Sequence, residues 1–330
     1  PEGHIRRALA HFTFPKMAQR VLDTFFVPGG KKPDAPYRTT AQPQVHGKRT
    51  FDELCIVSNF VEVFLAREGH GGPVGINYLE KIQLPHLPSL YGAMLAGVAV
   101  VIVGAGIAIE MPTVLDALAE HRAASYPAHV QGATGEAALR SVFDPAAYRE
   151  EAPDGPPLAR PAFFPIVSSD ALASIFVRKA KGRIDGFIVE TPVAGGHNAP
   201  PRGASHLTPD GQPVYGPRDV ADLAAMRALG LPFWLGGDYG SPEQVRAALA
   251  AGAAGVQVGT AFALCAESGL LPGVRRALVA RAIAGRARVF TDPKASPTGF
   301  PFKVAQLEGS LSEDAVYCRR TRICDLGYLR

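Results

Sequence analysis

Short apolar runs alternate with longer Ala- and Leu-rich segments from residue 74 onward. The apolar runs are β-branched and end at turn-forming residues, which predicts strands at Val74–Tyr78, Val98–Gly104, Phe163–Ser168, Gly186–Glu190, Pro232–Leu235 and Gly255–Gly259. The segments that follow most of them predict helices at Met111–His121, Asp170–Ala180, Asp219–Leu229, Pro242–Ala251 and Val274–Ala284. This alternation indicates an α/β fold with a parallel sheet and helical crossovers.

Other segments depart from this pattern. Residues 51–69 have a Phe, Leu and Val spacing that suits a helix and a β-branched content that suits a strand; we favour the helix. Residues 123–161 are rich in Pro and Gly and are interpreted as an insertion with a minor strand at Ser125–Val130. Residues 1–50 are interpreted as an N-terminal extension or a remnant of an early barrel segment, and 305–330 as a C-terminal tail.

The number of predicted strands limits the architecture. A closed (β/α)8 barrel, or TIM barrel, has eight strands, whereas the pattern predicts six. Either the sheet is open, or two βα units belong before Pro1, where the sequence starts without an initiator Met. With 330 residues, 47% of them hydrophobic, the chain is long enough to bury a large core.

Composition narrows the function classes. The net charge of +4 is mild and the basic residues are scattered apart from Arg319–Arg322, so we expect no nucleic-acid partner. No apolar run reaches the ~18 residues of a membrane span, so no membrane association is expected. Four Cys in so long a chain do not form a disulfide framework, and we expect free thiols in a reducing cytoplasm.

The stretch AVVIVGAGIAIEMP, residues 99–112, opens as a dinucleotide-binding unit does, with a strand that enters Gly104-Ala-Gly106. The fingerprint requires a third glycine, but Ile109 stands there. The next predicted strand lacks a ribose-binding acid, and Pro112 indicates that the helix begins late. We therefore interpret the stretch as a barrel strand whose glycines leave room for a ring or substrate.

Two later glycine-containing pairs are better candidates for binding phosphate. Gly236-Gly237 follows one predicted strand, and Gly259-Thr260 follows the next. Both pairs can present bare backbone N–H groups, and loops after the last two strands of a (β/α)8 barrel commonly bind phosphate. The alternative is that these glycines only form turns.

The candidate chemical centre is the loop TPVAGGHNAPPRG after the strand that ends at Glu190. Its Gly and Pro content excludes a helix, so His197 is expected at the carboxyl edge of the sheet, where barrel enzymes place catalytic groups. Gly195 and Gly196 let a flat ligand approach, and an imidazole can remove the proton of a carbon acid. Glu190 is either an acceptor for ligand hydroxyls or a solvated strand end. His206 has no acidic or Cys partner at metal spacing, so no metal site is expected.

Taken together, these motifs resemble the nitronate monooxygenase (2-nitropropane dioxygenase-like) flavoproteins, whose relatives include the FMN-dependent enoyl-acyl-carrier-protein reductases. The resemblance rests on VGINYL, AGGH, LGGD, GVQVGTAF and SPTGFPFKV, within residues 75–304. It implies a TIM barrel over residues 51–304 that holds FMN non-covalently, with the phosphate on the two glycine-containing pairs.

The resemblance also implies roles for single residues. His197 is the implied catalytic base. The implied flavin-contacting positions are Asn77, Glu190, Gly195, Gly196, Gly216, Gly236, Gly237, Gly259 and Thr260. Asn198-Ala-Pro-Pro replaces the small residue and Gly that often follow the His, and Ser168-Ser169 stand where some relatives have Lys. The first two family strands have no counterpart before Phe51.

Three functional hypotheses follow. The first is oxidation of nitronates or nitroalkanes with dioxygen to a carbonyl compound and nitrite, with His197 as the base. The second is an enoyl-thioester reductase that passes hydride from NAD(P)H through FMN, and the third is a non-catalytic barrel in a biosynthetic complex. A small-molecule substrate is expected in the first two cases, and a homodimer is the candidate oligomer.

Overall fold

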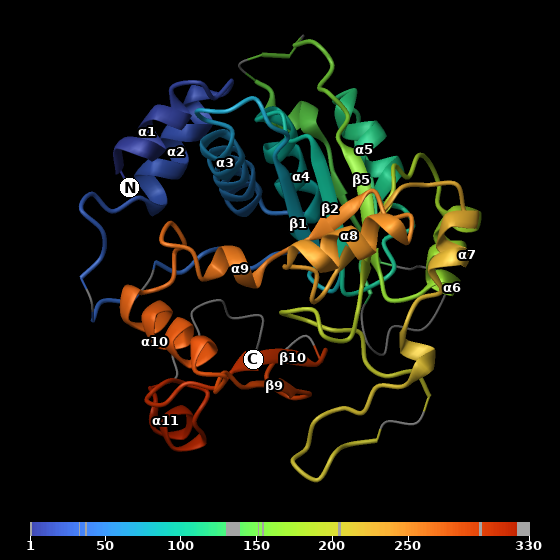
Figure 1. Ribbon diagram of the computed structural model, residues 1–330. Coiled ribbons are helices and arrows are strands. Elements are labelled where there is room, and N and C mark those ends of the chain that lie inside the picture. Colours follow the sequence, from blue (N-terminus) through green and yellow to red (C-terminus); the bar gives the residue numbers. More distant parts are fainter. Residues whose placement is uncertain are drawn as a thin grey trace. The chain divides into compact units, whose positions relative to one another are not determined.

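The computed structural model describes residues 2–32, 34–36, 38–129, 139–150, 152–153, 155–203, 206–296 and 299–321 (Figure 1). The chain divides into two compact units. Unit 1 contains the described residues up to Pro165 and the return segment Lys179–Asp185. Unit 2 contains Ile166–Arg178 and the described residues from Gly186 onward.

Unit 1 begins with three helices and then alternates strands with helices. Its helices are α1 (Glu2–Leu9), α2 (Pro15–Phe25), α3 (Arg49–Ala66), α4 (His86–Leu95) and α5 (Met111–Ala119). Its strands are β1 (Gly75–Leu79), β2 (Val100–Gly104), β3 (Ala124–Pro127), β4 (Arg140–Phe143) and the first part of β5 (Ala162–Val167). A 3₁₀ turn, η1 (Pro145–Tyr148), follows β4. Strands β1, β2 and β5 pair in parallel, while β3 and β4 form an antiparallel hairpin.

Unit 2 contains the second part of β5 and the later strands of the parallel sheet. Its other strands are β6 (Phe187–Glu190), β7 (Phe233–Gly236), β8 (Gly255–Gln257), β9 (Val289–Asp292) and β10 (Phe302–Ala305). Its helices are α6 (Asp170–Lys179), η2 (Pro217–Asp219), α7 (Leu223–Ala228), α8 (Pro242–Ala250), α9 (Thr260–Ala263), α10 (Pro272–Ile283) and α11 (Asp314–Arg319). Strands β5 to β8 pair in parallel in chain order, and β9 pairs antiparallel with β10.

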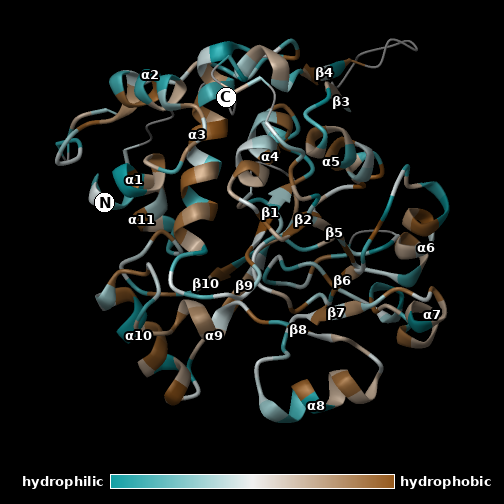
Figure 2. Cartoon of the chain, turned by 90° about the horizontal axis from the view of Figure 1, so that it is seen from above, coloured by the Kyte–Doolittle hydropathy of each residue, from teal (hydrophilic) through white to brown (hydrophobic). Residues whose placement is uncertain are grey.

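The strand order is β1-β2-β5-β6-β7-β8, and β5 contributes pairing to both units. All six predicted strands are present, with ends shifted by one or two residues, so the α/β class with a parallel sheet is confirmed. The apolar strand sequences can be followed in Figure 2. Among the described residues, no helix combines the length and the apolar character that a membrane crossing requires.

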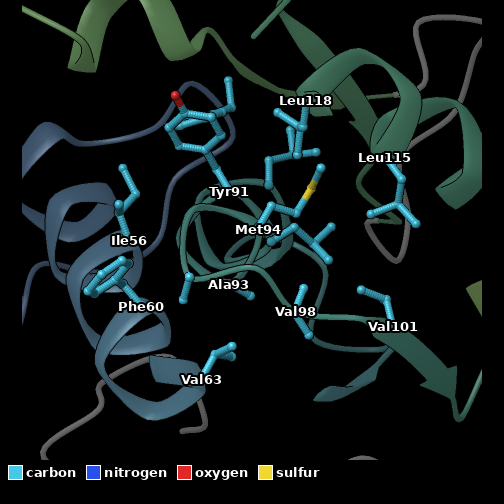
Figure 3. Packing of buried hydrophobic residues seen from close by; sticks show 14 of the residues in the cluster. Ile56, Phe60, Val63, Tyr91, Ala93, Met94, Val98, Val101, Leu115 and Leu118 are labelled. Carbon is cyan, nitrogen blue, oxygen red and sulfur yellow. The ribbon is translucent and has the colours of Figure 1, made fainter. Parts of the chain in front are cut away.

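The core of unit 1 is built around α4. Nine of its ten residues are buried, because α3 packs on one side and α5 on the other (Figure 3). Ile56 and Phe60 of α3 and Tyr91 of α4 belong to this core, and all three side chains are almost completely buried. Each fully buried side chain of this size contributes roughly 1.5–3 kcal/mol relative to an exposed one. This packing fixes the helices that support β1 and β2.

The start of β5 is anchored by a half-buried charge cluster. Arg160 donates to Asp116 at 2.9 Å and to Asp185 at 2.7 Å. Oδ2 of Asp185 also accepts the backbone N–H of Phe163 at 2.9 Å. The return segment 179–185 is therefore tied to the first residues of β5 by hydrogen bonds to charged groups, which are stronger than neutral ones.

The predicted helices are present at the expected places, but the residues at which some of them begin or end differ from the prediction. Most of residues 51–69 lies in α3, as favoured, although the helix ends at Ala66; α5 begins at Met111 after Glu110, as Pro112 indicated. The helix predicted at 219–229 begins only at Leu223, because the Asp222 side chain accepts the N–H groups of the following turn. Helices α1, α2, α4, α9 and α11 and strands β4, β9 and β10 were not predicted. The minor strand is β3, while Val130 lies outside the described residues.

The interpretation of the Gly104-Ala-Gly106 turn needs a correction. A Cβ on Gly106 would lie 2.3 Å from Cγ of Glu80, so the chain itself fills the space beside this glycine. Glu80 is held there because its carboxylate accepts the Tyr126 hydroxyl at 2.7 Å and the Gln83 amide at 3.0 Å. At Gly106 the missing side chain makes room for Glu80, not for a ring or substrate.

Replacing Gly92 with Ala should destabilise unit 1 by at least ~2 kcal/mol, because overpacking a dense core costs about this much or more. A Cβ at this position would lie 2.1 Å from the carbonyl oxygen of Ile56 on α3. Gly71→Ala is the matched control, since its added Cβ meets no atom within 4 Å. Urea unfolding checks this, and equal midpoints for the two variants would show that α3 and α4 do not approach so closely.

Candidate functional site

Polar groups gather where the strands of unit 2 end. The first three residues of β6 are buried, and the fourth, Glu190, is half-buried. Glu190 lies opposite Gly236 of β7, and Gly236 lies opposite Gln257 of β8. Strand interiors that are buried on both faces cannot carry such groups without cost, so functional side chains begin at the carboxyl ends.

The loop after β6 is held against the segment that enters β10. The N–H of Asn198 donates to the carbonyl of Pro301 at 2.8 Å, and the N–H of Lys303 donates to the carbonyl of Gly196 at 2.9 Å. His197 and Phe302 consequently lie opposite each other in an antiparallel bridge. These backbone contacts position His197, which the sequence predicted to lie on a loop.

The imidazole of His197 has two further contacts. Its ring meets the Phe302 ring edge to face, with centroids 4.9 Å apart. Its Nε2 lies 2.5 Å from Oγ of Ser296, within hydrogen-bonding distance. Ser296, Phe302 and Lys303 were not predicted as site residues; the only signal for them was the SPTGFPFKV motif of the family resemblance.

The two glycines of the LGGD motif differ in what requires them. Gly237 has φ of +99°, and its Cβ would lie 2.2 Å from Oγ1 of Thr191 and 2.9 Å from the nitrogen of Ala194. The β6 loop therefore demands glycine at this position. At Gly236 a Cβ would make only ordinary contacts, 3.5 Å from Cγ of Glu190 and 3.6 Å from Cβ of Gln257.

The Gly259-Thr260 turn lies beside the β6 loop. A Cβ on Gly195 would be 3.8 Å from Oγ1 of Thr260, whereas Gly196 and Gly259 would meet no atom within 4 Å. Their backbone faces open space that a ligand can approach. The Ser241 hydroxyl accepts the N–H of Gln244 as the N-cap of α8.

Two implied flavin contacts come from other parts of the chain. Asn77 is an exposed residue of β1 and belongs to unit 1. Gly216 lies in unit 2, but its N–H already donates to Oδ2 of Asp219 at 2.7 Å. The structure thus brings together Glu190 with the glycines of the β6, β7 and β8 loops, and it places His197 on the first of these loops.

Burial changes the acid–base properties of two side chains. Burial raises the pKa of Glu190 to about 7, and a hydrogen bond from Nε2 of Gln257 at 3.4 Å opposes this shift only partly. Burial lowers the pKa of Lys303, whose Nζ donates to Oγ1 of Thr291 at 2.6 Å. Glu190 therefore exchanges its proton near neutral pH.

The site offers a suitable set of groups for a polar, flat ligand such as FMN. Oδ1 of Asn198 is buried and has no hydrogen-bond partner among the described residues, while its Nδ2 donates to the carbonyl of Ala194 at 3.0 Å. An unpaired buried acceptor is costly and invites a ligand or water. The backbone at Gly196 and Gly259 is open, so a phosphate or a ring can approach it closely. Within the described ranges, no three His, Cys, Asp or Glu side chains come together as metal ligands.

Comparison with known proteins agrees with this geometry. Residues 161–291 match the family model of nitronate monooxygenase. The matched segment contains His197 and the glycine-containing pairs after β7 and β8. This agrees with the resemblance found in the sequence over the matched segment.

Other comparisons are less informative. No curated protein matches the sequence. A mutant of FabK from Thermotoga maritima is a similar solved structure, with a TM-score of 0.46 and 17% sequence identity over 87% of this chain and 76% of that chain. A likeness this weak establishes neither a common barrel nor a common reaction.

Alanine substitutions at Gly236 and Gly237 should show which glycine is required for FMN binding and which is required for packing of the chain itself. Gly237→Ala should lower the melting temperature, because its Cβ collides with Thr191 and Ala194. Gly236→Ala should lower the melting temperature of the FMN-free protein less than Gly237→Ala does, since its Cβ would make only ordinary van der Waals contacts. It should still weaken FMN binding measured by fluorescence quenching. Unchanged FMN affinity in Gly236→Ala would remove this glycine from the cofactor site.

Proposed function

We propose that this chain oxidises nitronates, and nitroalkanes that it first deprotonates, with dioxygen to a carbonyl compound and nitrite. The observation that carries the proposal is His197, held on an open glycine loop by Ser296, Phe302 and backbone hydrogen bonds. FMN, when bound, accepts electrons from the substrate and delivers them to dioxygen. A complete (β/α)8 barrel is part of the same proposal.

The chain supplies acid–base chemistry and positioning. The carbon next to a nitro group is a carbon acid, and a neutral imidazole with a pKa near neutrality is matched to remove its proton. The contact with Ser296 orients the imidazole of His197, and the Phe302 ring covers one side of it. Gly195, Gly196, Gly236, Gly259 and Thr260 would hold the cofactor beside this base.

Anaerobic mixing with a nitronate should bleach the visible absorbance of the bound flavin, because the substrate then reduces a cofactor that cannot pass its electrons on. Stopped-flow absorbance measures the rate. Rapid bleaching by NADH or NADPH alone, with none by any nitronate, would favour the enoyl-thioester reductase hypothesis. A purified protein that binds no FMN would instead favour the non-catalytic hypothesis.

His197→Asn should lower turnover of a neutral nitroalkane by roughly 10²–10⁴-fold, the usual contribution of a general base. Turnover of the pre-formed nitronate should fall far less, because that substrate has already lost its proton. Steady-state oxygen consumption with the two forms of one compound makes the comparison. Equal losses for both forms would reject the base role, and His197 would then only orient the substrate.

A further inference from the structure

Glu190, Gly236 and Gln257 form one row across the ends of three neighbouring parallel strands. A Cβ on Gly236 would lie 3.5 Å from Cγ of Glu190 and 3.6 Å from Cβ of Gln257, so both side chains lie on the same face of this glycine. Their head groups meet, with Nε2 of Gln257 donating to Oε1 of Glu190 at 3.4 Å. The Glu190 side chain therefore packs directly beside Gly236, and its carboxyl group meets the amide of Gln257 next to this glycine.

This arrangement conflicts with the proposed phosphate position unless the carboxyl is neutral. FMN carries a phosphate with a charge between −1.5 and −2 near pH 7, and two anions a few ångströms apart repel strongly in a partly buried site. Among the described residues, the only group that the structure pairs with Glu190 is the uncharged Gln257. Within the described part of the chain, no cation is paired with Glu190 to compensate its ionised form.

Titratable groups on the neighbouring elements do not resolve the conflict. Asp238 and Tyr239 follow the β7 glycines, His197 lies on the β6 loop, and Lys303 lies on β10. The pKa of Glu190 is raised by burial and lowered by the hydrogen bond from Gln257. Lys303 donates to Thr291.

We propose that the carboxyl group of Glu190 is protonated when FMN is bound with its phosphate near Gly236. Binding of the FMN phosphate then takes up one proton from solvent at this carboxyl group. The inference rests on the proposed FMN site. A protonated carboxyl has an O–H that can donate to a phosphate oxygen, whereas the ionised form can only accept. Gln257 already donates to Oε1, which leaves Oε2 to carry the proton.

The linkage has a definite sign. In the ligand-free site the pKa of Glu190 is about 7, and a bound anion raises it further because it disfavours the ionised form. FMN binding is then coupled to proton uptake, so affinity is full below pH 7 and falls up to tenfold per pH unit above it.

Isothermal titration of FMN into the FMN-depleted full chain tests this. At pH 8, in two buffers with different ionisation enthalpies, wild type should take up close to one proton per FMN. Glu190→Gln keeps the amide contact but cannot titrate, so it should take up almost none. It should bind FMN about as tightly as wild type at pH 6 and roughly tenfold more tightly at pH 8. Wild-type uptake near zero at pH 8 would overturn the inference whether or not the variant folds.

Two further measurements identify which side chain takes up the proton and which part of the ligand causes the uptake. His197→Gln should retain the wild-type uptake, and loss of uptake there would transfer the proton to the imidazole. Riboflavin, which lacks the phosphate, should cause clearly less uptake than FMN, and equal uptake would reject the phosphate as the cause. Absence of FMN binding altogether would contradict the proposed function, whereas tight binding without proton uptake would contradict only this inference.

Discussion

Two backbone hydrogen bonds determine whether the β6 loop can act as a site at all. They join Asn198 to Pro301 and Gly196 to Lys303, and so fix a loop that contains two consecutive glycines. Glycine loses more conformational freedom on ordering than any other residue, so an unpaired Gly195-Gly196 segment would not hold His197 in one place. Ser296 and the residues 301–303 are therefore as much a part of the site as the loop that carries the histidine.

The fold could be predicted from sequence where local pattern and burial agree. The strands of the parallel sheet are short apolar runs bounded by turn residues, and each appears within two residues of its expected position. Helix α4 escaped prediction because nine of its ten residues are buried, so its sequence shows no polar face and hence no helical period. The start of α7 depends on the Asp222 cap, which overrides the apolar spacing before it.

The site could be predicted only where its residues are neighbours in sequence. AGGH and the two glycine-containing pairs could be found because each follows a predicted strand and glycine lets a ligand approach the backbone closely. Ser296 and Phe302 approach His197 from about a hundred residues away through a bridge that no local pattern encodes. Glu190 was open to two interpretations because its environment depends on strand register, and register places it beside Gly236 and Gln257.

Glycines in this chain divide according to what occupies the position of the missing side chain. Glu80 fills that position at Gly106, and the β6 loop fills it at Gly237, so these glycines serve the chain's own packing. No atom fills it at Gly196 or Gly259, and at Gly236 the neighbours stand at ordinary contact distance. Sequence cannot distinguish these cases, because G-A-G and G-G are equally compatible with both. The ligand-facing surface is therefore smaller than the motifs suggest, and it lies where a carboxyl, an amide and open backbone meet.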